Sequence, residues 1–267
     1  MSNHHSAETV LLDGPDARAF AHAQFSSKVD SLATGQWQFS AWLDPQGRVR
    51  ALFHLVRLED ERYLLMLRGG DALTLAAALQ RFVFRSKVAV TAMEPRLLTT
   101  GPAMPLHEIR QEQDVLTLAC GDHSVEISTS GIKDDAWRLP QLHAGWPWLI
   151  PANAREFLPA ALSLQRLGAV AVDKGCYPGQ EIVARLHFRG GHKRHLHRGR
   201  LSQAVNIGDA LLAEGREVGH VLDRIHTSHG NEALLILNDD IVEQVYAGIF
   251  SMFDNHLALE LEASWPA

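Results

Sequence analysis

The chain has 267 residues, of which 46% are hydrophobic and 21% charged, and its net charge is -6 at pH 7. This length allows one large domain or two to three small ones with an ample core. The acidic balance argues against a mainly basic nucleic-acid binder, and two distant cysteines argue against a disulfide framework. No apolar run has the length of a membrane span and the N-terminus lacks a secretory signal, so we expect a soluble, cytoplasmic monomer with no membrane partner.

The N-terminal segment alternates between strand and helix signals. A short apolar run at 10–12 predicts a strand, 13–16 a turn, and Asp16 a cap for a helix over 17–24. Gln24 closes this helix, where it is either a polar site group or an ordinary surface glutamine.

The next 60 residues predict β structure followed by one helix. Apolar runs separated by turn residues indicate strands at 36–43, 49–58 and 63–67, an amphipathic helix at 71–84 and a strand at 88–92. Residues 93–112 contain three prolines and predict a connector, followed by strands at 115–119 and 124–128. Cys120 precedes Gly121-Asp122, which indicates a structural cysteine at a hairpin corner. Residues 137–143 form either a helix or an irregular segment.

The most distinctive stretch is 173–194, DKGCYPGQEIVARLHFRGGHKR. Tyr177-Pro178-Gly179 marks a tight turn, and the pattern becomes helical from Gln180. Cys176 therefore lies just before a short helix, where unpaired N–H groups favour negative charge. Lys174 and Arg185 are cations that would add to this effect, so the thiol is a candidate reactive group. The alternative is a buried, inert cysteine.

The segment from Arg185 to Arg200 is the most basic part of the chain and contains no acidic residue. Four histidines alternate with its cations, which predicts binding of an anion such as a phosphate or RNA. The alternative is a solvated basic loop in which His195 and His197 are exposed strand positions. The histidine spacing fits no common zinc pattern and Cys176 has no Cys-x-x-Cys partner, so no metal is predicted.

The last unit, 196–267, contains short apolar runs separated by turn residues, including one at 245–247. This pattern predicts a small antiparallel β-barrel, in which Gly219 permits close approach of a neighbouring strand.

The residues Lys174-Gly175-Cys176-Tyr177, Gly179-Gln180-Glu181, 183–185 and 188–190 together resemble the signature of the YgfZ family of folate-binding proteins. These proteins are relatives of the glycine-cleavage aminomethyltransferase and support iron–sulfur cluster proteins and some tRNA modification. The resemblance implies an α+β, aminomethyltransferase-like folate-binding fold, with α/β units around a central hole and a C-terminal antiparallel β-barrel. The expected units are 1–95 (the N-terminal folate-binding unit), 96–195 (which ends in the signature loop and helix) and 196–267 (the barrel).

The resemblance also implies tetrahydrofolate as cofactor, and iron–sulfur cluster proteins or assembly factors, with tRNA possible, as partners. Cys176 would supply a thiol for nucleophilic attack, redox exchange or transient cluster contact, with Lys174 and Arg185 tuning it. The sequence does not choose among these roles, nor decide whether the protein is an enzyme. The ligand-binding candidates are Tyr177, Gly179, Gln180, Glu181, Arg189, Lys193, Arg194, His143 and Gln24. Arg85 and Lys87 would steer the acidic tail of a folate or only complete a helix C-terminus.

Three departures from the relatives leave other functions to consider. Aminomethyltransferases carry an acidic pair where this chain has Arg48-Val49-Arg50-Ala51, which argues against folate-dependent aminomethyl or methyl transfer. His143 stands where the family usually has an acidic residue that pairs with the pterin. Ala160 and Ser163 replace a glutamine and an asparagine. Besides a folate-binding accessory protein and a folate-dependent transferase, the remaining hypothesis is a tRNA-binding module that uses the basic stretch 185–200.

Overall fold

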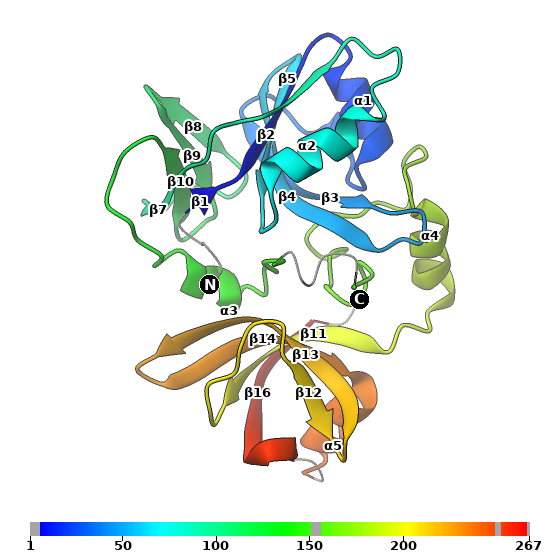
Figure 1. The fold of residues 1–267 in the computed structure, drawn as a ribbon, viewed down its shortest axis with the longest axis vertical. Coiled ribbons are helices and arrows are strands. Elements are labelled where there is room, and N and C mark those ends of the chain that lie inside the picture. The colour runs from blue at the N-terminus through cyan, green and yellow to red at the C-terminus, as the bar shows by residue number, and fades with distance from the viewer. Residues whose placement is uncertain (1–5, 151–155, 249–251, 266–267) are drawn as a thin grey trace.

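A computed structural model describes residues 6–150, 156–248 and 252–265, and Figure 1 shows its mixed α+β architecture, in which strands predominate. Residues 1–5, which are part of the N-terminal segment expected to lack a secretory signal, lie outside this description. In the described part, no helix is both long and apolar enough to cross a membrane.

The first sheet has the order β3-β4-β5-β2-β6 and is antiparallel throughout. Its strands are β2 (Thr9–Asp13), β3 (Gln36–Leu43), β4 (Val49–Glu59), β5 (Arg62–Leu67) and β6 (Ala89–Ala92). Helices α1 (Ala17–Gln24) and α2 (Ala72–Gln80) cover one of its faces, where Phe20 and Leu79 pack against Trp42 and Phe53. The opposite face packs into the central core of the molecule. Both faces are buried, which explains why these strands read as nearly continuous apolar runs.

The second sheet has the order β1-β7-β10-β9-β8. Its strands are β1 (Ser6–Ala7), β7 (Arg96–Gly101), β8 (Ile109–Glu112), β9 (Val115–Ala119) and β10 (Ser124–Ser128). The two sheets meet at the edge of β3, because Trp37 donates its backbone N–H to the carbonyl of His107 at 2.8 Å. Helix α3 (Arg138–His143) then leads toward the third unit.

The third sheet has the order β12-β13-β14-β11-β16-β15 and curls into a nearly closed, six-stranded antiparallel barrel (Figure 1). Its strands are β11 (Arg194–Leu201), β12 (Ala210–Ala213), β13 (Arg216–Thr227), β14 (Gly230–Asn238), β15 (Met252–Phe253) and β16 (Leu257–Trp265), with α5 (Asp239–Tyr246) between β14 and β15. Asp254 accepts hydrogen bonds from the backbone of Glu214 and Gly215, which ties the two end strands together. A Cβ on Gly219 would lie 2.5 Å from the Ile236 carbonyl oxygen, so the predicted close strand approach at this glycine is confirmed.

Three predictions about secondary structure are wrong. The expected connector at 93–112 contains β7 and β8, because Pro95 and Pro102 flank β7 rather than interrupt it. The helix expected over 71–84 ends at Gln80. The apolar run at 245–247 does not form a strand, since Val245 and Tyr246 belong to α5.

Candidate functional site

Cys176 is exposed and lies in the loop that precedes α4 (Gln180–Arg189), as the sequence predicts. Gly179 precedes α4 in a left-handed conformation with φ of 78°, and a Cβ there would lie 2.5 Å from the carbonyl oxygen of Asp44. A Cβ on Gly47 would lie 2.9 Å from Cβ of Ile182. Two glycines therefore allow the loop and the first turn of α4 to pack directly on the β3–β4 turn.

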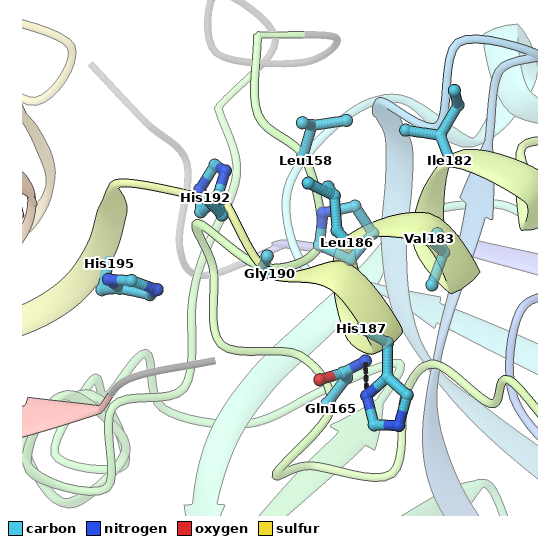
Figure 2. A pocket seen from close by; sticks show the side chains of 12 residues that line it. Leu158, Gln165, Ile182, Val183, Leu186, His187, Gly190, His192 and His195 are labelled. Carbon is cyan, nitrogen blue, oxygen red and sulfur yellow. Dashed lines mark hydrogen bonds between the residues drawn. The ribbon is translucent and has the colours of Figure 1, made fainter.

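A cavity of about 210 Å³ runs along α4 from Ile182 to the glycines that follow the helix (Figure 2). Ile182, Val183 and Leu186 supply apolar walls, and the imidazoles of His187, His192 and His195 add polar groups. The histidines are partly committed, because Gln165 lies 3.1 Å from Nδ1 of His187, and Nδ1 of His195 lies 2.6 Å from Asp239.

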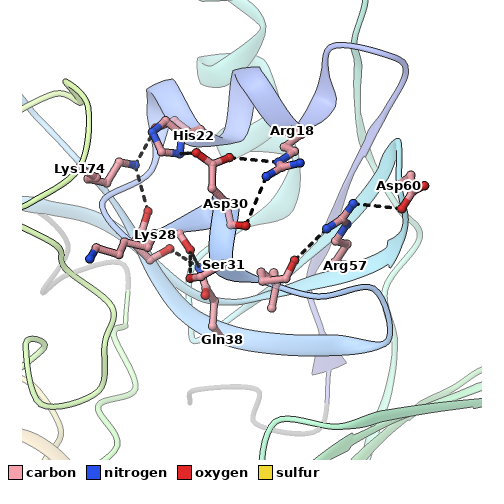
Figure 3. A network of polar contacts seen from close by, with 11 residues as sticks. Arg18, His22, Lys28, Asp30, Ser31, Gln38, Arg57, Asp60 and Lys174 are labelled. Carbon is pink, nitrogen blue, oxygen red and sulfur yellow. Dashed lines mark hydrogen bonds and ion pairs between the residues drawn. The ribbon is translucent and has the colours of Figure 1, made fainter.

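Lys174 holds the cysteine loop against the end of α1 (Figure 3). Its ammonium donates to the carbonyl oxygens of His22, Phe25 and Ser27 at 2.6, 2.6 and 2.9 Å. Burial lowers the pKa of Lys174 to about 8. Three carbonyls match the three donors of an ammonium, so these contacts brace the loop. The proposed tuning of the Cys176 thiol by Lys174 stays a prediction.

His22 is a neighbour of this loop that the sequence analysis missed. Its Nδ1 lies 3.2 Å from Asp30, whose carboxylate also accepts from Arg18 at 3.0 Å, and Figure 3 shows the three side chains facing one another. Its Nε2 lies 3.5 Å from the position that a Cβ on Gly175 would take, so the imidazole faces the backbone next to Cys176. A lone histidine in a helix gives no local signal for this contact.

Three further candidates surround the same loop. Tyr177 is buried and donates its hydroxyl to the carbonyl of Ala171 at 2.8 Å, and burial raises the pKa of Tyr177 to about 12. Gln180 donates to the carbonyl of Lys174 at 3.1 Å. Gln24 has a buried Oε1 without a hydrogen-bond partner among the described residues. Tyr177 and Gln180 therefore shape the loop from within, whereas Glu181 and Arg185 are exposed on α4.

The basic stretch is partly neutralised by acids from distant strands. Arg194 lies 3.4 Å from Glu217, Arg198 3.2 Å from Glu262 and Arg200 3.2 Å from Glu260. Arg189 and Lys193 are exposed and have no such acidic partner within the described ranges. These two cations are thus the members of the stretch most available to an anion.

His197 is buried in the barrel and is not an exposed strand position, which corrects that alternative. Its Nδ1 lies 2.9 Å from Oγ of Ser264, and burial lowers its pKa to about 4. The ring is therefore neutral near pH 7. No group of three His, Cys, Asp or Glu side chains in the described part is arranged to hold a metal ion.

His143 lies apart from the cysteine loop, on α3 against the barrel. Its Nε2 is 2.6 Å from a carboxylate oxygen of Glu232, which comes from β14 and also accepts from Thr227 at 3.2 Å. Burial raises the pKa of Glu232, but the hydrogen bonds from His143 and Thr227 outweigh it and leave the pKa below its usual value. The carboxylate of Glu232, 89 residues further along the chain, thus lies next to position 143, where the family usually has an acidic residue.

Gly145, two residues after His143, packs against a basic and an aromatic side chain. The guanidinium of Arg166 donates to the carbonyl of Gly145 and lies 4.9 Å from the ring centroid of Trp265. A Cβ on Gly145 would come within 2.7 Å of both side chains, so glycine leaves room for the indole. Ser163, one of the departures from the family pattern, donates its hydroxyl to the carbonyl of Trp265.

A larger, open groove of about 730 Å³ crosses the edge of β3. Gln36, Gln38 and Gln165 line it with amides, and Lys28 and Asp173 form an ion pair of 2.5 Å beside them. Cys176 lines neither this groove nor the cavity beside α4. The Cys176 thiol therefore lies outside the walls of both spaces, although Asp173, three positions earlier, lines the groove.

Comparison with known proteins gives a consistent result, although no protein-family model matches the chain. An uncharacterized protein of Haemophilus influenzae is 26% identical over 95% of this chain and 93% of its own length. A tRNA-modifying protein YgfZ of Klebsiella pneumoniae is 26% identical over 95% of this chain and 88% of its own length. The glycine cleavage system aminomethyltransferase T from Bartonella henselae aligns with a TM-score of 0.67 and 17% identity, over 89% of this chain and 79% of its own. Over most of its length the chain is therefore similar to YgfZ proteins, and it has the fold of that aminomethyltransferase.

Proposed function

We propose that this protein is a cytoplasmic, folate-binding accessory factor that supports iron–sulfur cluster assembly or repair and tRNA modification. The exposed thiol of Cys176, on a loop held by Lys174 and Tyr177, is the observation that carries this proposal. Relatives that match most of the chain are described as tRNA-modifying proteins, which supports the last part. The thiol is the group that would meet the partner protein or its cluster.

The pair His143 and Glu232 is the place that we propose for the pterin of tetrahydrofolate. The edge of a pterin presents N–H donors, and a carboxylate accepts two such bonds where a neutral histidine accepts one. Glu232 therefore restores the acceptor that the substitution at position 143 removes. Its hydrogen bond to His143, and the indole of Trp265 packed at Gly145 two residues after His143, fit a flat, polar heterocycle. Bound folate would supply one-carbon chemistry, whereas the residues of this chain bind and orient it.

Arg189 and Lys193 are the cations that we propose for the anionic glutamate tail. Both are exposed and are not held by an acidic side chain in the part of the protein described here. Arg194 is a weaker candidate, because Glu217 lies 3.4 Å from it.

Aminomethyl transfer is not part of this proposal. The guanidinium of Arg50 lies 4.2 Å from the ring centroid of Trp42, on the helix-covered side of the first sheet. A guanidinium cannot take up a proton from a substrate amine, so this position does not replace the missing carboxylate.

Binding is tested by titrating the purified protein with tetrahydrofolate under anaerobic conditions and following tryptophan fluorescence. Loss of a charge-assisted hydrogen bond is worth about 1.5–3 kcal/mol, so Glu232→Gln should weaken binding by about tenfold or more. Glu260→Gln, an exposed acid of β16, is the matched control and should bind as the wild type does. Equal affinities of the wild type and Glu232→Gln would remove this pair from the site.

The role of the thiol is tested separately in cells that lack the protein. Cys176→Ser should bind tetrahydrofolate normally yet fail to restore the activity of an iron–sulfur enzyme. Full restoration by this variant would remove Cys176 from the function.

A further inference from the structure

The end of α2 and the segment after it expose aromatic side chains to solvent. Phe84 is 85% exposed and Phe82 is 46% exposed, whereas Phe20, Phe25, Phe39 and Phe53 are buried. Leaving a phenylalanine side chain in water forgoes about 1.5–3 kcal/mol of burial free energy. Two exposed phenylalanines so close in the chain indicate a candidate binding surface.

The segment that carries Phe84 is held in place at both ends. Phe82 donates its backbone N–H to Leu79 at 2.9 Å, which continues α2 by one turn. At the other end, the backbone N–H of Lys87 donates to the carboxylate of Asp16 at 2.6 Å, and Asp16 donates its own N–H to the carbonyl of Lys87 at 3.3 Å. The exposure of Phe84 is therefore a property of a fixed backbone and not of a frayed end.

Cations flank these phenylalanines in the sequence. Arg81, Arg85 and Lys87 are exposed, and none has an acidic ion-pair partner among residues 6–150, 156–248 and 252–265. The guanidinium of Arg85 lies 5.4 Å from the ring of Phe84. On the other side, Phe82 contacts Trp42 at 5.9 Å between ring centroids, and Arg50 covers Trp42. In a chain of net charge -6, this surface combines basic groups with aromatic faces.

We propose that this surface, defined by Arg81, Phe82, Phe84, Arg85 and Lys87, binds an unpaired segment of tRNA. The cations would contact phosphates and the two phenylalanine rings would stack on bases, a combination used by proteins that bind single-stranded RNA. An acidic protein partner would match the charges but would not need the exposed rings. The choice of tRNA rests on the function proposed above, whereas the surface itself rests on the exposure and charge of these residues.

The position of the surface in the fold agrees with this assignment. It belongs to the helix layer of the first sheet, and the barrel packs into the core on the opposite side of that sheet. Lys174 anchors the cysteine loop to the end of α1, which belongs to the same layer. RNA on α2 would thus leave the pair His143 and Glu232 uncovered.

The proposal is tested by fluorescence anisotropy with a labelled tRNA transcript at 50 and 200 mM KCl. One lost stacking contact is worth about 1–3 kcal/mol, so Phe84→Ser should weaken binding by about tenfold. Arg81→Glu with Arg85→Glu should weaken binding further and reduce the slope of log K against log salt by about 1–2. Ile132→Ser, which changes a residue that is 89% exposed elsewhere, and Arg216→Glu on the barrel are the matched controls and should behave as the wild type does.

Two results would overturn the proposal: affinity unchanged by Phe84→Ser, or the same loss in Ile132→Ser. Dependence on Arg81 and Arg85 without Phe84 would mean that the RNA is held by charge alone, and would remove the stacking part of the proposal. Titration with tetrahydrofolate separates this proposal from the preceding one. If Phe84→Ser binds tetrahydrofolate normally and tRNA weakly, both stand. If the wild type binds tRNA through this surface but binds no tetrahydrofolate, only the folate site fails.

Discussion

The two cysteines of this protein occupy opposite environments. Cys176 is exposed on a loop that is held by contacts of the residues next to it. Cys120 is buried beside Gln141, and Nε2 of Gln141 lies 4.0 Å from the Cys120 sulfur. Burial raises the pKa of Cys120 to about 12. The comparison shows that backbone contacts, a buried tyrosine and a lysine hold the loop that exposes one thiol to water, whereas the other thiol is buried in the core.

The core around Cys120 contains an unusual buried arginine. Arg68 is 1% exposed and donates to the carbonyl of Pro147 at 2.7 Å, to Gln141 at 2.8 Å and to the carbonyl of Trp146 at 3.1 Å. Its guanidinium also lies 2.9 Å from Nε2 of His54. Burial lowers the pKa of Arg68 to about 10, which still leaves it charged near pH 7. Arg68 therefore ties β5 to the segment that follows α3.

The largest expected difference between the two regions is chemical reactivity. Iodoacetamide near pH 7.5 should modify Cys176 at least about 1000-fold faster than Cys120, because Cys120 reacts only after an opening that costs about 4 kcal/mol. Peptide mass spectrometry after timed quenching measures both rates in one sample. In urea the two rates should converge, and native rates of similar size would break the comparison.

The second prediction concerns the buried arginine. Arg68→Met should lower the free energy of unfolding by about 3 kcal/mol, because it leaves two carbonyls and the Gln141 side chain without their donor. Arg216→Met, at a side chain that is 81% exposed, is the control and should change stability by less than about 0.5 kcal/mol. Urea unfolding measures both. An unchanged midpoint for Arg68→Met would show that the bonds do not outweigh the cost of burying the charge.

The sequence predicted the loop of Cys176 well because its determinants are local. The turn residues, the glycine before the helix and the helical pattern from Gln180 all lie within a few positions of the thiol. α5 was missed although its signal was local too: Ile241, Val242 and Val245 follow helical spacing after two acidic residues.

The polar pairs could not be predicted in this way. Arg68 and Gln141 are 73 residues apart, and His143 and Glu232 are 89 apart. Only the packing of α3 against the first sheet and against the barrel brings them together. The single local hint was an arginine at the end of an apolar strand, just before Gly69-Gly70.

The third prediction concerns the effect of low pH on the stability of the core, which contains the buried His54. Burial, followed by the charge of Arg68, holds the pKa of His54 well below its ordinary value of 6.5. The unfolded chain takes up this proton near pH 6.5 and the folded chain does not, so stability is full above pH 6.5 and falls as the pH drops below it. Each such proton changes the free energy of unfolding by up to about 1.4 kcal/mol per pH unit.

Urea unfolding at pH 7.5, 6 and 5 measures this slope. His54→Gln keeps an acceptor for Arg68 and should reduce the slope by about one proton, and buried His197 should account for part of the remainder. An identical slope in wild type and His54→Gln would mean that His54 is protonated in the folded state.

The smallest effects are expected from exchanging sulfur for oxygen at the two sites. Cys176→Ser should change the free energy of unfolding by less than about 0.5 kcal/mol, because the new hydroxyl stays in water. Cys120→Ser should cost about 1 kcal/mol, since a more polar group enters the core where the sulfur has one acceptor, the carbonyl of Leu118 at 3.4 Å. Urea unfolding of both variants and of the double variant gives the values, which should add because the sites share no partner. A larger loss from Cys176→Ser than from Cys120→Ser would reverse the comparison, because the exposed sulfur would then be holding the loop and the loop's other contacts would not suffice.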